Sequence, residues 1–246
     1  MEHAQEREPL LGGADPAAAS ENQFLKDAST AVRAGFIQKV YGILFAQLLV
    51  TAVVAYPFVG IHSVKVWARQ QGFPLLVVCL VLNVAFLCSL SCCQDLARKV
   101  PTNYLLLFGF TATEGVLVGV ICSVYTINSI LFAVAATSFL VGGLSCYAMY
   151  TQSDFTTMGP YLFSAMIVLM IFGLFLAFFP IPFLQTVYCC IGILLFSFYL
   201  IYDTQLIMGK GELALGIDDY VLGALMLYVD IVQIFLYILQ LLGDRS

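Results

Sequence analysis

The last long apolar stretch of the chain reads YVLGALMLYVDIVQIFLYILQLL over residues 220–242. The stretch before it, residues 184–208, reads LQTVYCCIGILLFSFYLIYDTQLIM. Each is long enough to cross the hydrocarbon core of a bilayer, which takes about 20 helical residues. Each contains one aspartate, Asp203 or Asp230, and a carboxylate at membrane depth is costly unless it is paired, protonated or wetted. The two segments therefore indicate a membrane protein whose functional site includes a buried carboxyl pair.

The composition of the whole chain supports a membrane protein. Of 246 residues, 61% are hydrophobic and 10% charged, whereas a soluble domain carries about 25% charged residues. Backbone polar groups in lipid must be satisfied within each segment, which favours helices. The sequence predicts an all-α polytopic fold, a seven-transmembrane-helix bundle. Its expected spans are 36–59, 73–91, 104–124, 128–149, 158–179, 184–208 and 220–242.

Two regions are expected along the chain. Residues 1–32 are polar and lack an apolar period, which predicts a disordered cytosolic tail, and residues 33–243 form the transmembrane domain. Within the tail, Glu6, Leu10 and Leu11 fit an acidic dileucine sorting signal for Golgi, lysosomal or vacuolar membranes. An endomembrane location, which includes the endoplasmic reticulum, is therefore expected.

The basic residues predict the orientation. With a cytosolic N-terminus, seven of the ten Lys and Arg residues lie on the cytosolic side, which the positive-inside rule favours. These seven are Arg7, Lys26, Arg33, Lys39, Arg98, Lys99 and Lys210. The chain has no basic stripe, so no nucleic-acid partner is expected. The expected partner of the apolar spans is the lipid bilayer.

Four polar residues fall at similar depths of four different spans. From a rise of 1.5 Å per residue, Asp203 lies about 10 Å, Asn83 about 12 Å, and Glu114 and Asp230 roughly 15 Å from the cytosolic ends of their spans. The sequence predicts that they converge on one layer. In the last span, Asp230, Gln233 and Tyr237 share one face by their spacing, and this face should turn inward to line a pore or site. A hydrogen-bonded packing seam is the alternative interpretation.

Two carboxylates close together at this depth cannot both ionise cheaply, and such a pair shares a proton. The sequence therefore predicts a pH-gated latch between the last two spans. Carboxylate oxygens are also hard ligands for Ca²⁺, which makes Asp203, Asp230 and Glu114 candidates for a transient calcium site. Ca²⁺ is then the permeant ion, and no cofactor is expected. The cations Arg98 and Lys99 are candidate partners of the pair, with topology determination as the alternative.

Ordered sequence motifs carry a family resemblance. They are RAGFIQKVY at 33–41, NYLLLFGFT at 103–111, DF at 154–155, IYDT at 201–204 and LYVDI at 227–231. In these motifs the chain resembles the transmembrane Bax-inhibitor-motif family, in its lifeguard and Golgi anti-apoptotic branch.

The resemblance implies a fold and a function. The fold has seven helices with the last one central. The function is a Ca²⁺ leak across internal membranes, controlled by a di-aspartyl pH sensor, and protection against cell death. The sensor aspartates correspond to Asp203 and Asp230, and a sensor-linked arginine falls near Arg98.

Two other functions remain open at this stage. A membrane scaffold would regulate other channels or death-pathway proteins, with the aspartates only stabilising the bundle. An intramembrane aspartyl protease also places Tyr-Asp and Asp in consecutive spans, but it needs Gly-x-Gly-Asp where this chain has Leu227-Tyr228-Val229-Asp230. The sequence therefore predicts that this protein is not an enzyme.

Overall fold

The computed structural model describes residues 16–93 and 97–245. In these residues, seven helices are long and apolar enough to cross a membrane. They are α1 (Pro16–Gly60), α2 (His62–Cys92), α4 (Thr102–Cys122), α5 (Ile127–Tyr150), α6 (Gly159–Phe178), α7 (Pro182–Met208) and α8 (Tyr220–Leu242). A short 3₁₀ helix, η1 (Thr156–Met158), precedes α6. The prediction of an all-α bundle of seven membrane-spanning helices is confirmed.

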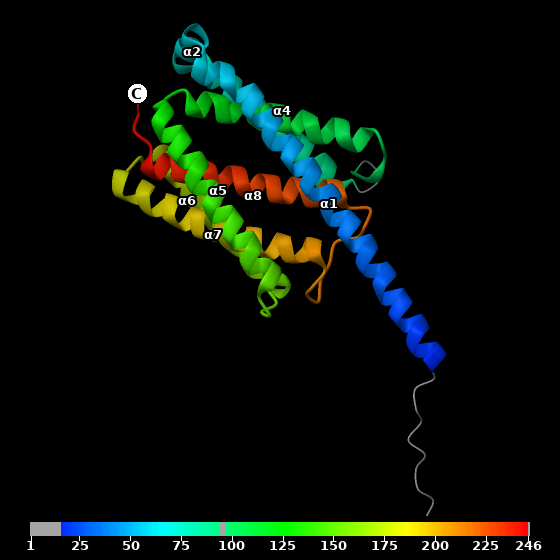
Figure 1. Cartoon of the computed structure of the whole chain (residues 1–246). Coiled ribbons are helices and arrows are strands. Elements are labelled where there is room, and N and C mark those ends of the chain that lie inside the picture. Colours follow the sequence, from blue (N-terminus) through cyan, green and yellow to red (C-terminus); the bar gives the residue numbers. More distant parts are fainter. Residues whose placement is uncertain (1–15, 94–96, 246) are drawn as a thin grey trace, which may run out of the picture.

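Helix α8 lies at the centre of the bundle, with the other helices around it (Figure 1). Of its most apolar 18-residue window, 61% is buried, compared with 17% for the corresponding windows of α2, α5 and α6. The outer helices keep their apolar side chains exposed, as expected where lipid takes the place of water. The last helix is therefore the core of the fold.

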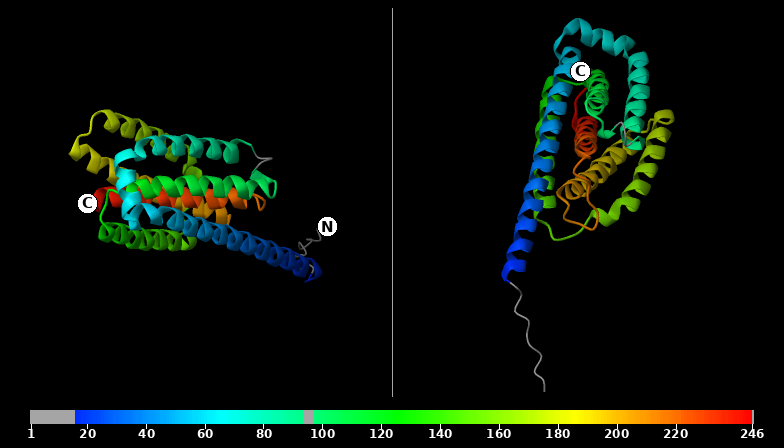
Figure 2. Two further views of the ribbon diagram at one scale, coloured as in Figure 1. Left: turned by 90° about the horizontal axis from the view of Figure 1, so that it is seen from above. Right: turned by 90° about the vertical axis from the view of Figure 1, so that its right-hand side faces the viewer.

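The connections between the helices lie on two opposite sides of the bundle. One side, here called the N-side, carries the end of α2, the start of α4 and the segments between α5 and α6 and between α7 and α8 (Figures 1 and 2). The opposite C-side carries the α4–α5 turn and the C-terminal residues. Tyr125 in this turn pairs with Arg245, and Thr126 N donates to Asp244 O at 3.0 Å.

Local sequence sets several helix ends and bends. Thr126 caps α5, because its side chain accepts a hydrogen bond from Ser129 N. Helix α7 ends at Gly209, whose φ of 65° is left-handed and suits glycine. Helix α2 turns in its N-terminal half (Figure 2), the part that contains Pro74. A proline inside a helix removes one backbone hydrogen bond and bends the axis.

Glycines 115 and 119 bring α4 close to α1. A Cβ added at Gly115 would lie 3.0 Å from Val54, and one at Gly119 would lie 2.6 Å from Phe58 and 3.0 Å from the backbone of Ala55. The GxxxG spacing therefore works here as it does in other membrane helices, by allowing close backbone approach. This contact fixes the side of α4 from which Glu114 projects.

Two boundaries differ from the sequence-based expectation. Helix α1 begins at Pro16, whereas a disordered tail is expected through residue 32. Residues 16–32 are rich in alanine and other good helix formers, and a proline suits the first helical position, so a helix forms there without an apolar period. Helix α2 begins at His62 instead of residue 73, because Pro74 lies inside the helix and does not start it.

Candidate functional site

The two aspartates of the last spans lie against each other between α7 and α8. Asp203 and Asp230 are each 3% exposed. Their carboxyl groups lie within hydrogen-bonding reach of each other. Within the described part of the chain, Asp203 Oδ1 and Asp230 Oδ2 are buried without a hydrogen-bond partner. The structure thus brings together the two carboxyl groups that the sequence pairs, and leaves one acceptor oxygen on each unused.

An arginine of α1 holds the segment between the two aspartates. Arg33 Nη2 donates to Leu206 O and Arg33 Nη1 donates to Leu215 O, both at 2.7 Å. Leu215 N also donates to Leu206 O at 3.0 Å, so the α7–α8 connection, residues 209–219, folds back over the end of α7. A cation at a helix C-terminus is favoured by the helix dipole. Sequence analysis counted Arg33 only toward orientation and as part of a family motif.

The α5–α6 connection binds the same region from another direction. Gln205, two residues after Asp203, accepts from Phe155 N at 2.8 Å and donates to Ser153 O at 2.9 Å. Asp154 accepts from Thr156 Oγ1 at 2.7 Å, from Glu212 N at 3.0 Å and from Thr156 N at 2.8 Å.

Asp154 is exposed, and these hydrogen bonds lower the pKa of its carboxyl group from the ordinary value. The bond from the Thr156 hydroxyl has the largest effect, followed by the backbone bonds from Glu212 and Thr156. A Cβ at Gly211 would collide with the side chains of Asp154 and Thr156, so glycine lets the connection approach them closely.

The predicted sensor-linked cations do not reach the aspartate pair. Arg98 Nε and Nη2 donate to the two carboxylate oxygens of Asp219, at 2.8 and 3.0 Å, immediately before α8. Lys99 is exposed. Nearby, the ammonium of Lys39 lies 3.2 Å from the centre of the Tyr220 ring. The expectation that Arg98 contacts the pair is therefore corrected: it holds the N-terminal end of α8, about 15 Å along the helix from Asp230.

Glu114 belongs to a second polar cluster between α2 and α4. Asn83 Nδ2 donates to Glu114 Oε2, and Thr113 Oγ1 donates to Asn83 Oδ1. Glu114 is 9% exposed and Asn83 is 6% exposed. The cost of burying these polar groups is offset, because the Asn83 amide donates to the Glu114 carboxyl group and accepts from the Thr113 hydroxyl.

The depth argument predicts that the four polar residues form a single site. The structure instead divides them between two helix contacts. In the described residues, no group of three His, Cys, Asp or Glu side chains is arranged to hold a metal ion. The depths agree because depth along a helix says nothing about which way a side chain points around it. Asp203 and Asp230 lie at the α7–α8 contact, whereas Asn83 and Glu114 lie at the α2–α4 contact.

Buried hydroxyl and amide groups lie between the two clusters. Gln47 Nε2 donates to Thr111 Oγ1 at 3.0 Å, which joins α1 to α4. The hydroxyls of Thr51 and Tyr228 are 2.7 Å apart, which joins α1 to α8 two residues before Asp230. Sequence analysis missed Tyr228 and Thr51 as site residues, because hydroxyl groups give a weak signal inside apolar segments.

The polar face of α8 continues toward the C-side. Tyr237 donates through its hydroxyl to Tyr188 of α7 at 3.1 Å, and Gly192 leaves room for the Tyr237 ring. Gln233 is half-buried on the same helix. A cavity of about 370 Å³ follows at the ends of α6, α7 and α8, with Gln185 and Gln240 in its wall. The residues Glu6, Leu10 and Leu11 of the predicted sorting signal lie outside the described residues.

The fold and the carboxyl pair define a class: a multi-pass integral membrane protein with ionisable side chains buried between its last two helices. The chain belongs to the family described as inhibitor of apoptosis-promoting Bax1, which matches residues 33–246. It is 34% identical over 219 residues to protein lifeguard 3 of Homo sapiens, covering 87% of this chain and 70% of that protein. It is also 34% identical over 220 residues to protein LIFEGUARD 2 of Arabidopsis thaliana, covering 87% and 89%. The family resemblance is confirmed.

Proposed function

We propose that this protein is a pH-sensitive Ca²⁺ leak channel of an internal membrane, gated by Asp203 and Asp230, and that it acts against programmed cell death. The observation that supports the gate is the contact between the two carboxyl groups in the buried α7–α8 seam. The family description, inhibitor of apoptosis-promoting Bax1, supports the cellular role.

The gate depends on a shared proton. Two ionised carboxylates have only acceptor oxygens, so a hydrogen bond between them requires that one is protonated. With one proton, the pair links α7 to α8. Without it, two negative charges face each other in a medium that screens them poorly, and the helices are pushed apart. The state of the proton thus decides whether the seam is closed.

The permeant ion is Ca²⁺, because carboxylate oxygens are the ligands that this ion prefers. The unused oxygens of Asp203 and Asp230 are the acceptors that a passing cation would meet. Glu114 provides a separate carboxyl group on the other side of α8. Transport needs binding that is favourable enough for entry but weak enough for release. Two separate carboxyl sites, the aspartate pair and Glu114, meet this need better than one site that encloses the ion.

The N-side connections couple the pair to the aqueous phase. Arg33, Gln205 and Asp154 hold the segment that begins a few residues after Asp203. Movement of α7 away from α8 would stretch these contacts, so they contribute to the free energy difference between the closed and open states. Under the predicted orientation, this side faces the cytosol of a Golgi, endoplasmic reticulum, lysosomal or vacuolar membrane.

A scaffold that regulates other channels or death-pathway proteins is the second candidate. The hydrogen-bonded polar residues of α1, α4 and α8 favour it, because they show that buried polar groups in this bundle also have structural roles. The scaffold predicts that neutral variants of the aspartates change stability but reveal no ion flux.

The test is Ca²⁺ flux into liposomes that contain the purified protein and an enclosed calcium dye. Flux is measured from about pH 6 to 8, the range in which a proton-sharing pair can titrate. The variants are Asp203→Asn and Asp230→Asn, with Asp218→Asn as an exposed acidic control on the same connection. We expect wild type and control to leak with the same pH dependence, and either site variant to lose it.

Folding of each variant is checked by thermal unfolding before flux is compared. If folded wild-type protein gives no flux above empty liposomes, the channel is refuted and the scaffold is favoured. If both site variants keep the wild-type pH profile, the leak stands but the aspartate gate fails. Cleavage of a reporter peptide by the reconstituted protein would instead indicate the intramembrane protease.

A further inference from the structure

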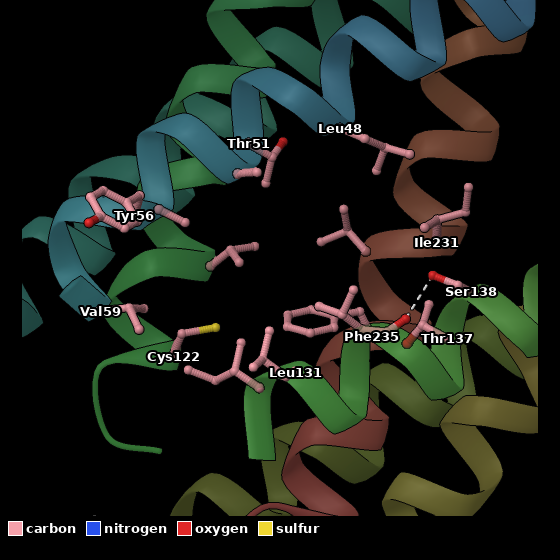
Figure 3. A pocket seen from close by; sticks show the side chains of 16 residues that line it. Leu48, Thr51, Tyr56, Val59, Cys122, Leu131, Thr137, Ser138, Ile231 and Phe235 are labelled. Carbon is pink, nitrogen blue, oxygen red and sulfur yellow. Dashed lines mark hydrogen bonds between the residues drawn. The ribbon is translucent and has the colours of Figure 1, made fainter. Parts of the chain in front are cut away.

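A groove opens on the side of the bundle between α1 and α5. Helices α1 and α5 both pack on α8, and α4 closes the groove on its other side (Figure 3). Its volume is about 490 Å³, which is within the range of ligand pockets, about 300 to 1,000 Å³. Its side chains are mainly aliphatic, and no charged side chain of the described residues lines it.

The groove is as long as one leaflet of a bilayer is deep. It extends along α1 from Leu48 to Val59, about 16 Å at 1.5 Å per residue. Half of the hydrocarbon core is about 15 Å. Val59 and Cys122 lie at its C-side end, and Leu48 and Ile231 lie at its inner end near the middle of the bundle (Figure 3).

The groove is open to lipid along its length. Tyr56 on α1 and Leu131 on α5, which face each other across it, are 67% and 62% exposed. In a membrane, such an opening adjoins acyl chains and not water. An apolar cavity does not hold water well, and an empty one forfeits dispersion contacts on its walls. An apolar chain from the bilayer therefore fits it best.

Positive charge gathers at the C-side end of the groove. Arg69 Nε donates to Ser123 O at 2.7 Å, and Lys65 Nζ lies 3.5 Å from Tyr125 O. Both carbonyls belong to the α4–α5 turn, which connects Cys122 to the groove residues of α5. The C-terminal residues Asp244 and Arg245 reach the same turn. Three basic residues and one acidic residue thus contact the turn at this end of the groove.

We infer that the α1–α5 groove binds one acyl chain of an anionic glycerophospholipid from the C-side leaflet, with its headgroup at Lys65 and Arg69. The chain would run inward from Val59 and end near Leu48. Such a lipid would fill the gap that α1 and α5 leave beside α8. This inference does not depend on the proposed Ca²⁺ leak.

One hydroxyl group in the groove, that of Thr137, allows an acyl chain to be told apart from a more polar ligand by mutation. Thr137 is 4% exposed, and its Oγ1 has no hydrogen-bond partner in the described part of the chain. It lies at the inner end, where an acyl chain offers only methyl and methylene groups. Thr137→Val should therefore keep an acyl chain bound, whereas it should weaken a ligand whose polar group reaches the middle of the bundle.

The test is native mass spectrometry of the full chain. The protein is reconstituted in vesicles of phosphatidylcholine with a minority of phosphatidylglycerol, then released in mild detergent. We expect wild type to retain one phospholipid, enriched in phosphatidylglycerol. Ala52→Trp fills the groove and should reduce retention roughly tenfold. Val53→Trp, on the adjacent exposed position outside the groove, is the matched control and should retain lipid.

Further variants keep the test decisive. Val134→Phe fills the groove from α5 and replaces Ala52→Trp if that variant does not fold. Lys65→Gln with Arg69→Gln should remove the enrichment of phosphatidylglycerol while a phospholipid is still retained. The inference is overturned if both filled variants retain as much lipid as Val53→Trp, if the doubly neutral variant keeps the enrichment, or if Thr137→Val abolishes binding.

Discussion

The guanidinium of Arg33 bridges the backbone of Leu206 and that of Leu215, with both N–H···O distances at 2.7 Å. Leu206 lies three residues after Asp203, and Leu215 lies in the loop that leads to α8. The first membrane helix is therefore hydrogen-bonded to the segment that connects the two buried aspartates.

Arg33→Lys should destabilise the protein, because an ammonium group cannot reproduce the planar two-pronged geometry of the guanidinium. Loss of one such bond should cost about 1 to 2 kcal/mol. Thermal unfolding in detergent measures the change. Lys99→Gln, which removes an exposed cation on the same side, should leave the melting temperature unchanged. Equal melting of Arg33→Lys and wild type would show that the bridge contributes little.

The ion pair of Arg98 and Asp219 should contribute little to stability, because the two side chains are 48% and 18% exposed. A double-mutant cycle with Arg98→Gln and Asp219→Asn should give a coupling of about 0.2 to 1 kcal/mol, and added salt should reduce it. The pH dependence of Ca²⁺ flux should survive Arg98→Gln. Loss of that dependence would show that Arg98 acts on the aspartate pair despite its distance from it.

Gly119→Ala should be destabilising, because the new methyl group would lie 2.6 Å from Phe58 and 3.0 Å from the Ala55 backbone. Overpacking of this kind costs about 1 to 3 kcal/mol. Gly142→Ala is the matched control, since a Cβ at Gly142 meets nothing within 4 Å. Comparison of the two melting temperatures is the measurement. A Gly142→Ala variant that melts as low as Gly119→Ala would exclude close packing as the cause.

Asp154→Asn should destabilise the protein at neutral pH and not in acid. Hydrogen bonds, first of all from the Thr156 hydroxyl, lower the pKa of Asp154 in the folded state. Its carboxylate therefore stabilises the fold above the ordinary pKa of aspartate, about 3.9, and this contribution is lost as the pH falls through the lower folded value.

The stability difference between wild type and Asp154→Asn should accordingly shrink on acidification below about pH 4. Unfolding followed across a pH series measures it. Ser153→Ala, which changes no ionisable group, should differ from wild type by the same amount at every pH. A gap for Asp154→Asn that stays constant in acid would contradict the assigned hydrogen bonds.

The spans could be predicted because their signal is local. An apolar run of sufficient length specifies a membrane helix whatever its neighbours are. The central position of the last helix was expected from the family resemblance. The sequence itself supports that position, because α8 has the clearest polar stripe, running from Asp230 to Tyr237. Boundaries were less predictable, since Pro74 indicates a helix start in the sequence but lies within a continuous helix.

The site could be predicted only in part. Asp203 and Asp230 lie on helices that are consecutive in sequence, and consecutive helices usually pack together. Glu114 and Arg98 were assigned to the same site by depth and by charge, and neither property gives the direction of a side chain around the bundle. The role of Arg33 depends on two backbone carbonyls, one at the end of α7 and one in the α7–α8 connection. Both lie more than 170 residues away in sequence, which no local pattern indicates.

The central position of α8 has a consequence for biosynthesis. Within the described chain, the helix that all others surround is the last to leave the ribosome. Helices α1, α5 and α7 enter the membrane before the helix on which they pack exists, so until then lipid or other helices must cover the faces that later contact α8. The native arrangement can close only after residue 242 has been inserted, and a polypeptide halted before α8 would keep the contacts of α4 with α1 and α2 but lack its central helix. An unfinished molecule therefore differs from a complete one in the uncovered faces of α1, α5 and α7.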